Sequence, residues 1–320
     1  MKKLCLSHVK DIDGLSSAAL VRAATGSEFR LTDYDTLFDE LNGIRAGVTE
    51  LVVCDLGTDK SRFAEFSGTL RRLSERLRIT YIDHHYISPE DKAVLKALPI
   101  TLVHNVNECA GMLTYLHFRE SLPEEAKAVA LYAAVTDYMD NSTNAKRIME
   151  TYDRHFVLLE STLLSYALAF EGKDPEYPYM LVRQLAKMRP PHQIPGVAES
   201  ALKQANVTVR LAKQVKREGA KLRNVAYIET KQGSTGGVAK LLLGAFGTPV
   251  GVAYRNKPGG RSEMSLRCTS ACRVHLGQTI GAIAAKHGGS GGGHARAAGC
   301  TVPTADVKEV LRELDTAVSA

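Results

Sequence analysis

The sequence has no tryptophan, and tyrosine and phenylalanine bring the aromatic content to only 6% of its 320 residues. A groove that stacks many successive nucleic-acid bases needs more aromatic side chains, so the composition does not indicate one. Positive charge is also limited, because a net charge of +6 and an isoelectric point near 8.9 are only mildly basic. This balance suits an anionic substrate and falls short of a protein that holds long duplex DNA through many phosphates.

Cysteine is sparse, with six scattered residues and no Cys-x-x-Cys pair, which argues against a structural zinc site. Cys5 and Cys54 lie inside apolar runs, as small core residues do. Cys268 and Cys272 are four positions apart, either as a weak metal or redox pair or as free thiols. No apolar run has the length of a membrane span, and the start Met1-Lys2-Lys3 does not resemble a secretory signal. We therefore expect a cytoplasmic protein without a membrane partner.

Length and pattern predict two α/β domains, because 320 residues exceed a typical single domain. In the first part, apolar runs alternate with helical patterns, which predicts a doubly wound parallel sheet. Prolines and glycines collect in residues 172–196 as a boundary zone, and a basic helix is expected at about 197–222. We predict a larger parallel-sheet domain, a helical linker and a smaller α/β domain with its own core, at residues 1–190, 191–224 and 225–320.

Three apolar runs of the first part each end in side chains that bind metals. The polar residues that follow them are His8, Asp11 and Asp13, then Asp55, then Asp83, His84 and His85, and Asp137 ends a later predicted helix. The carboxyl ends of parallel strands share one edge, so these residues can converge. Asp11 and Asp13 alternate with Ile12, so in an extended segment both carboxylates project to one side, where a divalent cation removes their repulsion. The alternative for this stretch alone is a helix N-cap cluster beside a hydrogen-bonded histidine.

The number of candidate ligands suggests two ions, because six or seven side chains exceed what one ion takes beside water and substrate. A carboxylate can bridge two ions about 3.5–4 Å apart, the spacing used for in-line displacement at phosphorus. Mixed carboxylate and imidazole ligands favour Mn²⁺ or Mg²⁺, with Zn²⁺ or Fe²⁺ as further options. Asp83 is expected to orient the neighbouring histidines, or alternatively to cap the next turn.

A glycine-rich stretch near the C-terminus predicts a second functional element. Glycines let backbone N–H groups approach an anion, and His294 can donate to a terminal phosphate or stack near a base. Arg267 lies upstream, and its guanidinium can bind a phosphate through two hydrogen bonds. We predict substrate binding by Arg267, Gly291, Gly292, Gly293 and His294. For the glycines alone, the alternative is a flexible turn.

In combination, the His8-x-x-Asp11-x-Asp13-Gly14, Asp55, Asp83-His84-His85 and Asp137 motifs resemble those of the DHH phosphoesterase superfamily. The glycine-rich stretch, with Ser265-Leu266-Arg267 and Ala297-Ala298-Gly299, resembles its DHHA1 substrate domain. The resemblance covers nearly the whole chain and implies a di-manganese phosphodiesterase or exonuclease. It implies one ion on His8, Asp11 and Asp55 and a second on Asp13, Asp55, His84 and Asp137. Asp55 would bridge the two ions, and His85 would face the scissile phosphate.

The resemblance implies hydrolysis of short oligonucleotides, including linear dinucleotides such as pGpG or pApA, to mononucleotides. The alternatives are a RecJ-like single-strand exonuclease, a hydrolase of cyclic dinucleotides or 3′-phosphoadenosine phosphate, and a non-catalytic nucleotide-binding relative. The two-residue gap between His8 and Asp11 is closer to the RecJ-like and archaeal branches than to the nanoRNase type, which leaves the substrate open. A homodimer is a further family-based expectation.

Overall fold

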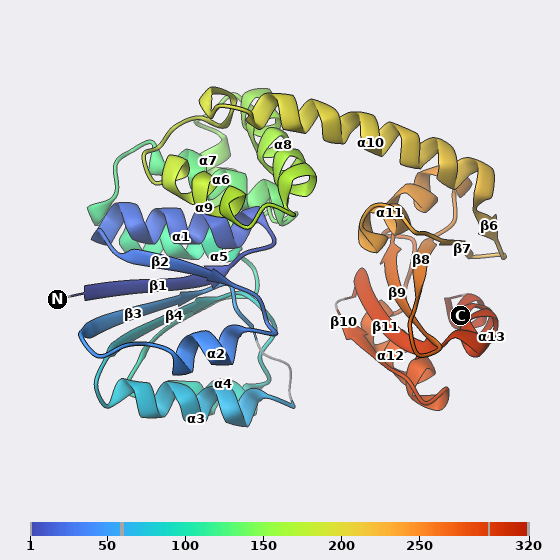
Figure 1. The fold of residues 1–320 in the computed structure, drawn as a ribbon, viewed down its shortest axis with the longest axis horizontal. Helices are drawn as coiled ribbons and strands as arrows, with labels where there is room; N and C mark the ends of the chain where they lie inside the picture. The colour runs from blue at the N-terminus through green and yellow to red at the C-terminus, as the bar shows by residue number, and fades with distance from the viewer. Residues whose placement is uncertain (1, 58–60, 294, 319–320) are drawn as a thin grey trace. The chain divides into compact units, whose positions relative to one another are not determined.

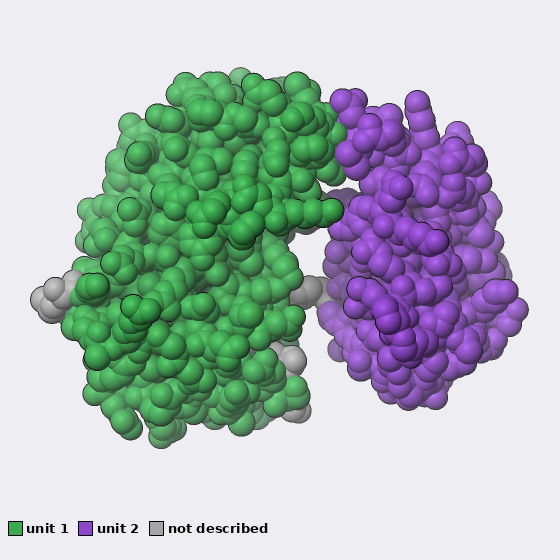
Figure 2. Space-filling view, viewed as in Figure 1, with its two compact units in different colours: residues 1–204 green, residues 205–320 purple. Residues whose placement is uncertain are grey.

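The computed structural model describes residues 2–57, 61–293 and 295–318. The chain separates into two compact units, residues 1–204 and 205–320, which Figure 2 shows in different colours. The division falls within helix α10 (Val197–Glu218). The bounds of this helix are close to the 197–222 expected for the basic helix. In the part of the chain described, no helix combines the length and the apolar character needed to cross a bilayer.

The first unit is built on a five-stranded sheet of order β2-β1-β3-β4-β5, in which every neighbouring pair is parallel (Figure 1). Its strands are β1 (Lys2–His8), β2 (Glu28–Thr32), β3 (Val48–Cys54), β4 (Arg78–Asp83) and β5 (Thr101–His104). Alternate side chains enter different cores, so that Leu4 and Leu6 lie in one cluster and Cys5 in the other. Burial on both faces explains why the central strands are continuous apolar runs in the sequence.

Helices cover both faces of this sheet (Figure 1). One face carries α2 (Leu37–Asn42), α3 (Phe63–Ser74) and α4 (Pro89–Lys96), and the other carries α1 (Ile12–Thr25), α5 (Ala110–Phe118), α6 (Ala126–Thr136), α7 (Thr143–Met149), α8 (Arg154–Glu171) and α9 (Glu176–Leu185). Short 3₁₀ turns lie at Arg119–Ser121 and Pro191–Gln193. The doubly wound architecture expected from the sequence is therefore confirmed.

The proline-rich zone at residues 172–196 differs from the expected boundary, because it contains helix α9. Leu181, Val182 and Leu185 of this helix are fully buried in the core that α1 shares. Pro178 lies in the first turn of α9, where a missing N–H group leaves no helical hydrogen bond unmade. Proline therefore marks a helix start here and not the end of the unit.

The second unit has a six-stranded mixed sheet of order β10-β11-β9-β8-β7-β6, in which only the β7–β8 pair is parallel among the described strands. Its elements are β6 (Ala220–Lys221), β7 (Val225–Glu229), α11 (Thr235–Phe246), β8 (Val250–Lys257), β9 (Arg261–Cys268), α12 (Leu276–Lys286), β10 (Ser290–Gly293), β11 (Ala297–Pro303), a 3₁₀ turn at Thr304–Asp306 and α13 (Val307–Val318). Helices α12 and α13 share one core with the sheet, and α11 shares another with the end of α10. The unit thus has its own core, and all six cysteines of the chain are free thiols.

Candidate active site

Strands β1, β3 and β4 end side by side at one edge of the parallel sheet. The register pairs Ser7 with Cys54, and Cys54 with Ile82, so the residues that follow these positions emerge together. Among the described residues, three groups of potential ligands have atoms within 4.8 Å of one another: His8, Asp11 and Asp55; Asp13, His84 and Asp137; and Asp55, His84 and His85. The sheet edge therefore brings all six predicted metal ligands and His85 into one cluster.

Asp11 and Asp13 reach this cluster from the start of a helix. Asp11 is the N-cap of α1, and its carboxylate accepts a hydrogen bond from the N–H of Gly14 at 2.9 Å. The prediction that both carboxylates project from an extended segment is therefore wrong, because the chain becomes helical directly after Asp11. Gly14 permits the sharp turn, since a Cβ at this position would lie 2.3 Å from the carbonyl oxygen of His8. The other carboxylate oxygen of Asp11 lies 2.7 Å from Nδ1 of His8.

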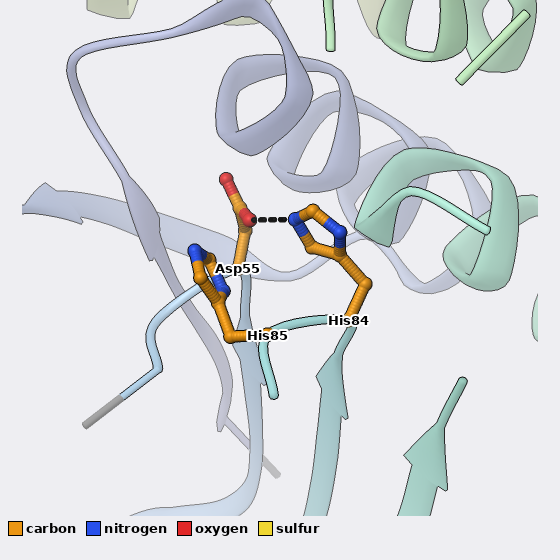
Figure 3. Close-up of side chains that lie close together, drawn as sticks. All are labelled: Asp55, His84 and His85. Atoms are coloured by element: carbon orange, nitrogen blue, oxygen red, sulfur yellow. Dashed lines mark ion pairs between the residues drawn. The ribbon is translucent and has the colours of Figure 1, made fainter. Parts of the chain in front are cut away.

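Asp55 lies between two imidazoles, one near each of its carboxylate oxygens. Oδ2 is 3.6 Å from Nδ1 of His8, and Oδ1 is 3.4 Å from Nε2 of His84, the pair drawn in Figure 3. Asp55 is buried and has a φ of 56°, a left-handed conformation that residues other than glycine seldom adopt. Its N–H group donates to the carbonyl of Ile82 at 3.0 Å, which fixes the residue at the sheet edge. Such local strain is common at functional sites, and here it aims one carboxylate at two groups of ligands.

His84 lies between two further carboxylates. Its Nε2 is 3.6 Å from Oδ2 of Asp13, and its Nδ1 is 3.7 Å from Oδ2 of Asp137, the residue that follows α6. Asp13 is buried and accepts hydrogen bonds from the N–H groups of Ala110 at 2.9 Å and Gly111 at 2.6 Å. These two bonds come from the first turn of α5 and fix the orientation of the Asp13 carboxylate.

Burial and crowding shift the pKa values of the cluster. Burial, together with the negative charges of Asp11 and Asp13, raises the pKa of Asp55 well above its usual range. Burial and the charge of Asp13 raise the pKa of Asp137 to about 7. Burial opposes protonation of His8, but the carboxylates of Asp11 and Asp55 outweigh it and raise its pKa to about 10. The carboxylates of the site therefore repel one another in a buried environment, and a bound cation would reduce this repulsion.

The arrangement of donor atoms fits divalent cations. Two ligands at right angles on an ion with bonds of about 2.1 Å lie about 3 Å apart, close to the carboxylate–imidazole separations of 3.4–3.7 Å. Both ring nitrogens of His8 are buried, and neither makes a hydrogen bond of acceptable geometry with the described residues. The polar neighbours of both nitrogens are carboxylate oxygens at 2.7–3.6 Å, on Asp11, Asp33 and Asp55, and such surroundings fit an imidazole that binds a cation together with carboxylates.

Asp83 and His85 belong to a hydrogen-bonded chain beside the cluster. Tyr81 donates from its hydroxyl to Oδ2 of Asp83 at 3.0 Å, and Nδ1 of His85 lies 2.8 Å from Oδ1. Burial opposes ionisation of Asp83, but the nearby positive charge of His85 outweighs it and lowers the Asp83 pKa. An ionised Asp83 can only accept hydrogen bonds, so Nδ1 of His85 donates to it and Nε2 points away.

Two residues of the site were missed in the sequence. Tyr34 packs its ring 5.0 Å from that of His8, and its hydroxyl lies 3.3 Å from Nε2 of His85. Asp33 lies with Oδ1 3.6 Å from Nε2 of His8 and forms an ion pair with Lys10. Both residues directly follow strand β2. The same criterion that identified the other ligands, polar residues at the carboxyl end of a strand, would therefore have predicted them.

In the second unit, Arg267 lies on β9 beside the start of α11. Its Nη1 donates to the carbonyl of Leu266 at 2.9 Å, and a Cβ at Gly236 would lie 2.6 Å from its Nη2. The position of this guanidinium is thus set by its own strand and by the first turn of α11. Its role in binding a substrate remains a prediction.

The glycine-rich stretch is not a loop. Gly291, Gly292 and Gly293 belong to strand β10, which pairs antiparallel with β11. Helix α12 packs so closely on this strand that a Cβ at Gly277 would lie 2.1 Å from the carbonyl oxygen of Gly293. The alternative of a flexible turn does not hold, because the three glycines form a paired strand. A Cβ at Gly291 or Gly293 would lie 2.6 Å from an atom of β11, whereas a Cβ at Gly292 would meet nothing within 4 Å. Anion binding by these glycines remains a prediction, and His294 lies outside the described residues.

Comparison with known proteins gives one matching family model and several solved structures of similar fold. Residues 223–320 match the family model of the DHHA1 domain, and no curated protein matches the sequence. The pGpG-specific phosphodiesterase PggH from Vibrio cholerae matches with a TM-score of 0.61 and 16% identity, over 100% of this chain and 99% of its own. The DHH domain of a member of the s1p family of ribosomal proteins matches with a TM-score of 0.70 and 16% identity, over 99% of this chain and 86% of its own.

RecJ from Thermus thermophilus, in the structure of its complex with Mn²⁺, gives a further match. The TM-score is 0.66 and the identity 15%, over 99% of this chain and 52% of the RecJ chain. The present chain thus spans about half the length of that protein. At these identities, the structural likenesses establish a shared two-unit fold.

Proposed function

We propose that this chain, whose residues 223–320 match the DHHA1 family model and whose fold is similar to those of PggH and a DHH domain, is a divalent-metal-dependent phosphodiesterase acting on short oligonucleotides. The observation that carries the proposal is the Asp55 carboxylate, whose two oxygens face His8 and His84 within a buried, acid-rich cluster. Two groups of ligands that share such a carboxylate are the arrangement that two-ion phosphoryl chemistry requires.

We propose that His8, Asp11 and Asp55 hold one ion and that Asp13, Asp55, His84 and Asp137 hold the other. Oxygen and nitrogen donors without a thiolate favour Mn²⁺ or Mg²⁺, and the Mn²⁺ bound by the RecJ of similar fold supports this choice. When bound, the ions would supply Lewis-acid stabilisation of charge on phosphoryl oxygens and lower the pKa of water.

The remaining side chains would orient the substrate. Asp83 fixes His85 through Nδ1, so that Nε2 can donate a hydrogen bond to a phosphoryl oxygen as negative charge builds there. The hydroxyl of Tyr34 contacts the same Nε2 and would be displaced from it, or rotate, when a phosphate binds. In the second unit, we propose that Arg267, Gly291, Gly292, Gly293 and His294 bind the far end of the substrate.

A short substrate is favoured by two observations. The mild net charge of +6 offers few phosphate contacts for a long strand. PggH, which is matched over 99% of its own length, is specific for pGpG. The second candidate is a single-strand exonuclease activity, which is supported by the similar fold of RecJ.

The test is turnover with Mn²⁺ on RNA and DNA from two to about twenty nucleotides, alongside cyclic dinucleotides and 3′-phosphoadenosine phosphate. The proposal expects hydrolysis that falls steeply beyond a few nucleotides and that is lost with EDTA. Undiminished turnover on the longest strands would establish the exonuclease instead. Absence of turnover on every phosphodiester, with Mn²⁺ present, would overturn the assignment as an enzyme of this class.

A further inference from the structure

Glu108 is a buried carboxylate close in the chain to the backbone that holds Asp13. The residue is 2% exposed. It accepts hydrogen bonds from the hydroxyl of Ser142 at 2.6 Å and from the backbone and side-chain N–H groups of Asn144, each at 2.9 Å. All three donors belong to the segment that leads from Asp137 into α7. Glu108 belongs to none of the three metal-capable groups of the described residues, so any effect on the site acts through other side chains.

Glu108 lies two residues before the backbone that holds Asp13. The N–H groups of Ala110 and Gly111 donate to the two oxygens of Asp13, at 2.9 and 2.6 Å. Gly111 approaches so closely that a Cβ there would lie 3.0 Å from Oδ1 of Asp13. Because these contacts leave little freedom, a displacement of this segment would move the Asp13 carboxylate with it.

On its other side, Glu108 anchors the turn that carries Asp137. Tyr138 has a φ of 60°, the left-handed region that a bulky side chain disfavours. The turn is closed by hydrogen bonds from the N–H of Met139 back to the end of α6, at 2.7 Å, and from the N–H of Ser142 to the carbonyl of Met139, at 3.0 Å. A strained turn persists only where its surroundings hold it, and the three bonds to Glu108 fix the end of this segment at Ser142 and Asn144.

We propose that Glu108 is a positioning residue that sets the separation of Asp13 and Asp137, the two carboxylates on either side of His84. It joins the segment whose N–H groups hold Asp13 to the turn that presents Asp137. The other group of ligands is positioned by different elements, namely the end of β1, the N-cap of α1 and the end of β3. The inference rests on the proposed function, since it assigns Glu108 to one of the two cation sites.

Two substitutions of Glu108 distinguish the loss of its hydrogen bonds from the loss of its negative charge. In Glu108→Gln, the side-chain oxygen can still accept both bonds from Asn144, and the new NH₂ group can donate to the hydroxyl of Ser142. In Glu108→Ala, all three bonds are lost. A matched control is Glu160→Ala, because Glu160 on α8 is also fully buried and accepts a hydrogen bond from the backbone of another segment, at His192, at 2.9 Å.

The experiment is a Mn²⁺ titration of the metal-free full chain by calorimetry and electron paramagnetic resonance, without substrate. We expect two sites in the unmodified protein. Glu108→Ala should keep one site and weaken the other by about 10–100-fold, the usual effect of losing a residue that orients a ligand. Glu108→Gln and Glu160→Ala should retain both sites. A purely structural role for Glu108 would lower the melting temperature without this selective loss.

Equal affinity at both sites in Glu108→Ala, or equal weakening of both, would overturn the inference and leave the proposed function standing. If Glu108→Ala does not fold, the double variant Ser142→Ala/Asn144→Ala removes two of the three donors from the other side and must show the same selective loss. Failure of the unmodified protein to bind Mn²⁺ at all would instead overturn the proposed function, so the two failures are distinguishable.

Discussion

Replacing Asp55 by asparagine should raise the stability of the metal-free protein while weakening its response to Mn²⁺. Burial and the charges of Asp11 and Asp13 raise the pKa of Asp55, so the folded protein is penalised for carrying this carboxyl group. Because the Asp55 pKa is higher in the folded than in the unfolded protein, this loss of folding free energy is absent below pH 3.8, the pKa in the unfolded chain. The loss grows as the pH rises from 3.8 to the pKa in the folded protein. The gain in stability of Asp55→Asn should therefore grow over the same pH range.

The size of the gain is bounded by proton uptake. At pH 7, protonating a carboxyl group of ordinary pKa 3.8 costs about 4 kcal/mol, at 1.36 kcal/mol per pH unit. One like-charge contact is of similar size, since Asp11 and Asp55 have carboxylate oxygens within 4.8 Å of each other, and at that limit two charges repel by about 3.5 kcal/mol at an effective dielectric constant of about 20. The attraction to protonated His8 offsets part of this repulsion. We expect a net gain of about 1–3 kcal/mol, which corresponds to a rise of about 2–12 °C in the melting temperature of a unit of this size.

The response to Mn²⁺ should have the opposite sign. At a free concentration about 100 times Kd, each bound ion stabilises the folded protein by about 2.7 kcal/mol. A 100-fold loss of affinity would cut this stabilisation to about 0.4 kcal/mol at the same Mn²⁺ concentration. The thermal shift that Mn²⁺ produces in Asp55→Asn should therefore be a small fraction of that in the unmodified protein.

The assay is thermal unfolding by circular dichroism at pH 7, first in EDTA and then with Mn²⁺. Asp83→Asn is the matched control, because Asp83 is equally buried but has a lowered pKa, so its substitution should destabilise the protein in EDTA. A lower melting temperature of Asp55→Asn than of the unmodified protein in EDTA, or equal stabilisation of the two proteins by Mn²⁺, would refute this prediction.

Three further predictions follow from individual contacts. Tyr81→Phe removes a buried donor to Asp83 and should lower the free energy of unfolding in urea by about 1–3 kcal/mol; an unchanged midpoint would contradict this. Gly14→Ala should destabilise by about 1–3 kcal/mol, because its Cβ would clash with the carbonyl at the end of β1; a stabilised variant, as at an ordinary helix position, would contradict it. Glu313 raises the pKa of His287, so Glu313→Gln should lower that pKa in an NMR titration. The contact between protonated His287 and Glu313 stabilises the folded protein fully below pH 6.5, and this stabilisation is lost as the pH rises through the pKa of His287 in the folded protein. The difference in stability between the unmodified protein and Glu313→Gln should therefore vanish at high pH.

The fold and most of the candidate site follow from local sequence patterns. Continuous apolar runs such as the one in β3 indicate strands buried on both faces, and their alternation with helices indicates parallel pairing. Parallel pairing then places the residues after each strand at a common edge, which is why His8, Asp55 and His84 could be grouped from the sequence.

Errors arose where packing decides between local conformations. Two conformations were open for Asp11, an extended segment and a helix N-cap, and its carboxylate caps α1 three residues after β1 ends at His8. A flexible turn was the alternative for the glycines alone, but Gly291, Gly292 and Gly293 form a strand that pairs with β11. The prolines and glycines of residues 172–196 indicated a boundary zone, but Pro178 lies in the first turn of the buried helix α9, where proline leaves no helical hydrogen bond unmade.

The sequence by itself determined which chemical groups this protein offers: carboxylates and imidazoles at successive strand ends, with few aromatics and no thiolate pair for zinc. Only the tertiary structure decided which carboxylate oxygen faces which imidazole, and that Tyr34 lies beside His8 and His85. The physical reason is that backbone pairing between neighbouring strands fixes the position of the residue that follows each strand. The direction of its side chain depends on contacts with residues distant in the chain, such as the N–H groups of Ala110 and Gly111 that hold Asp13.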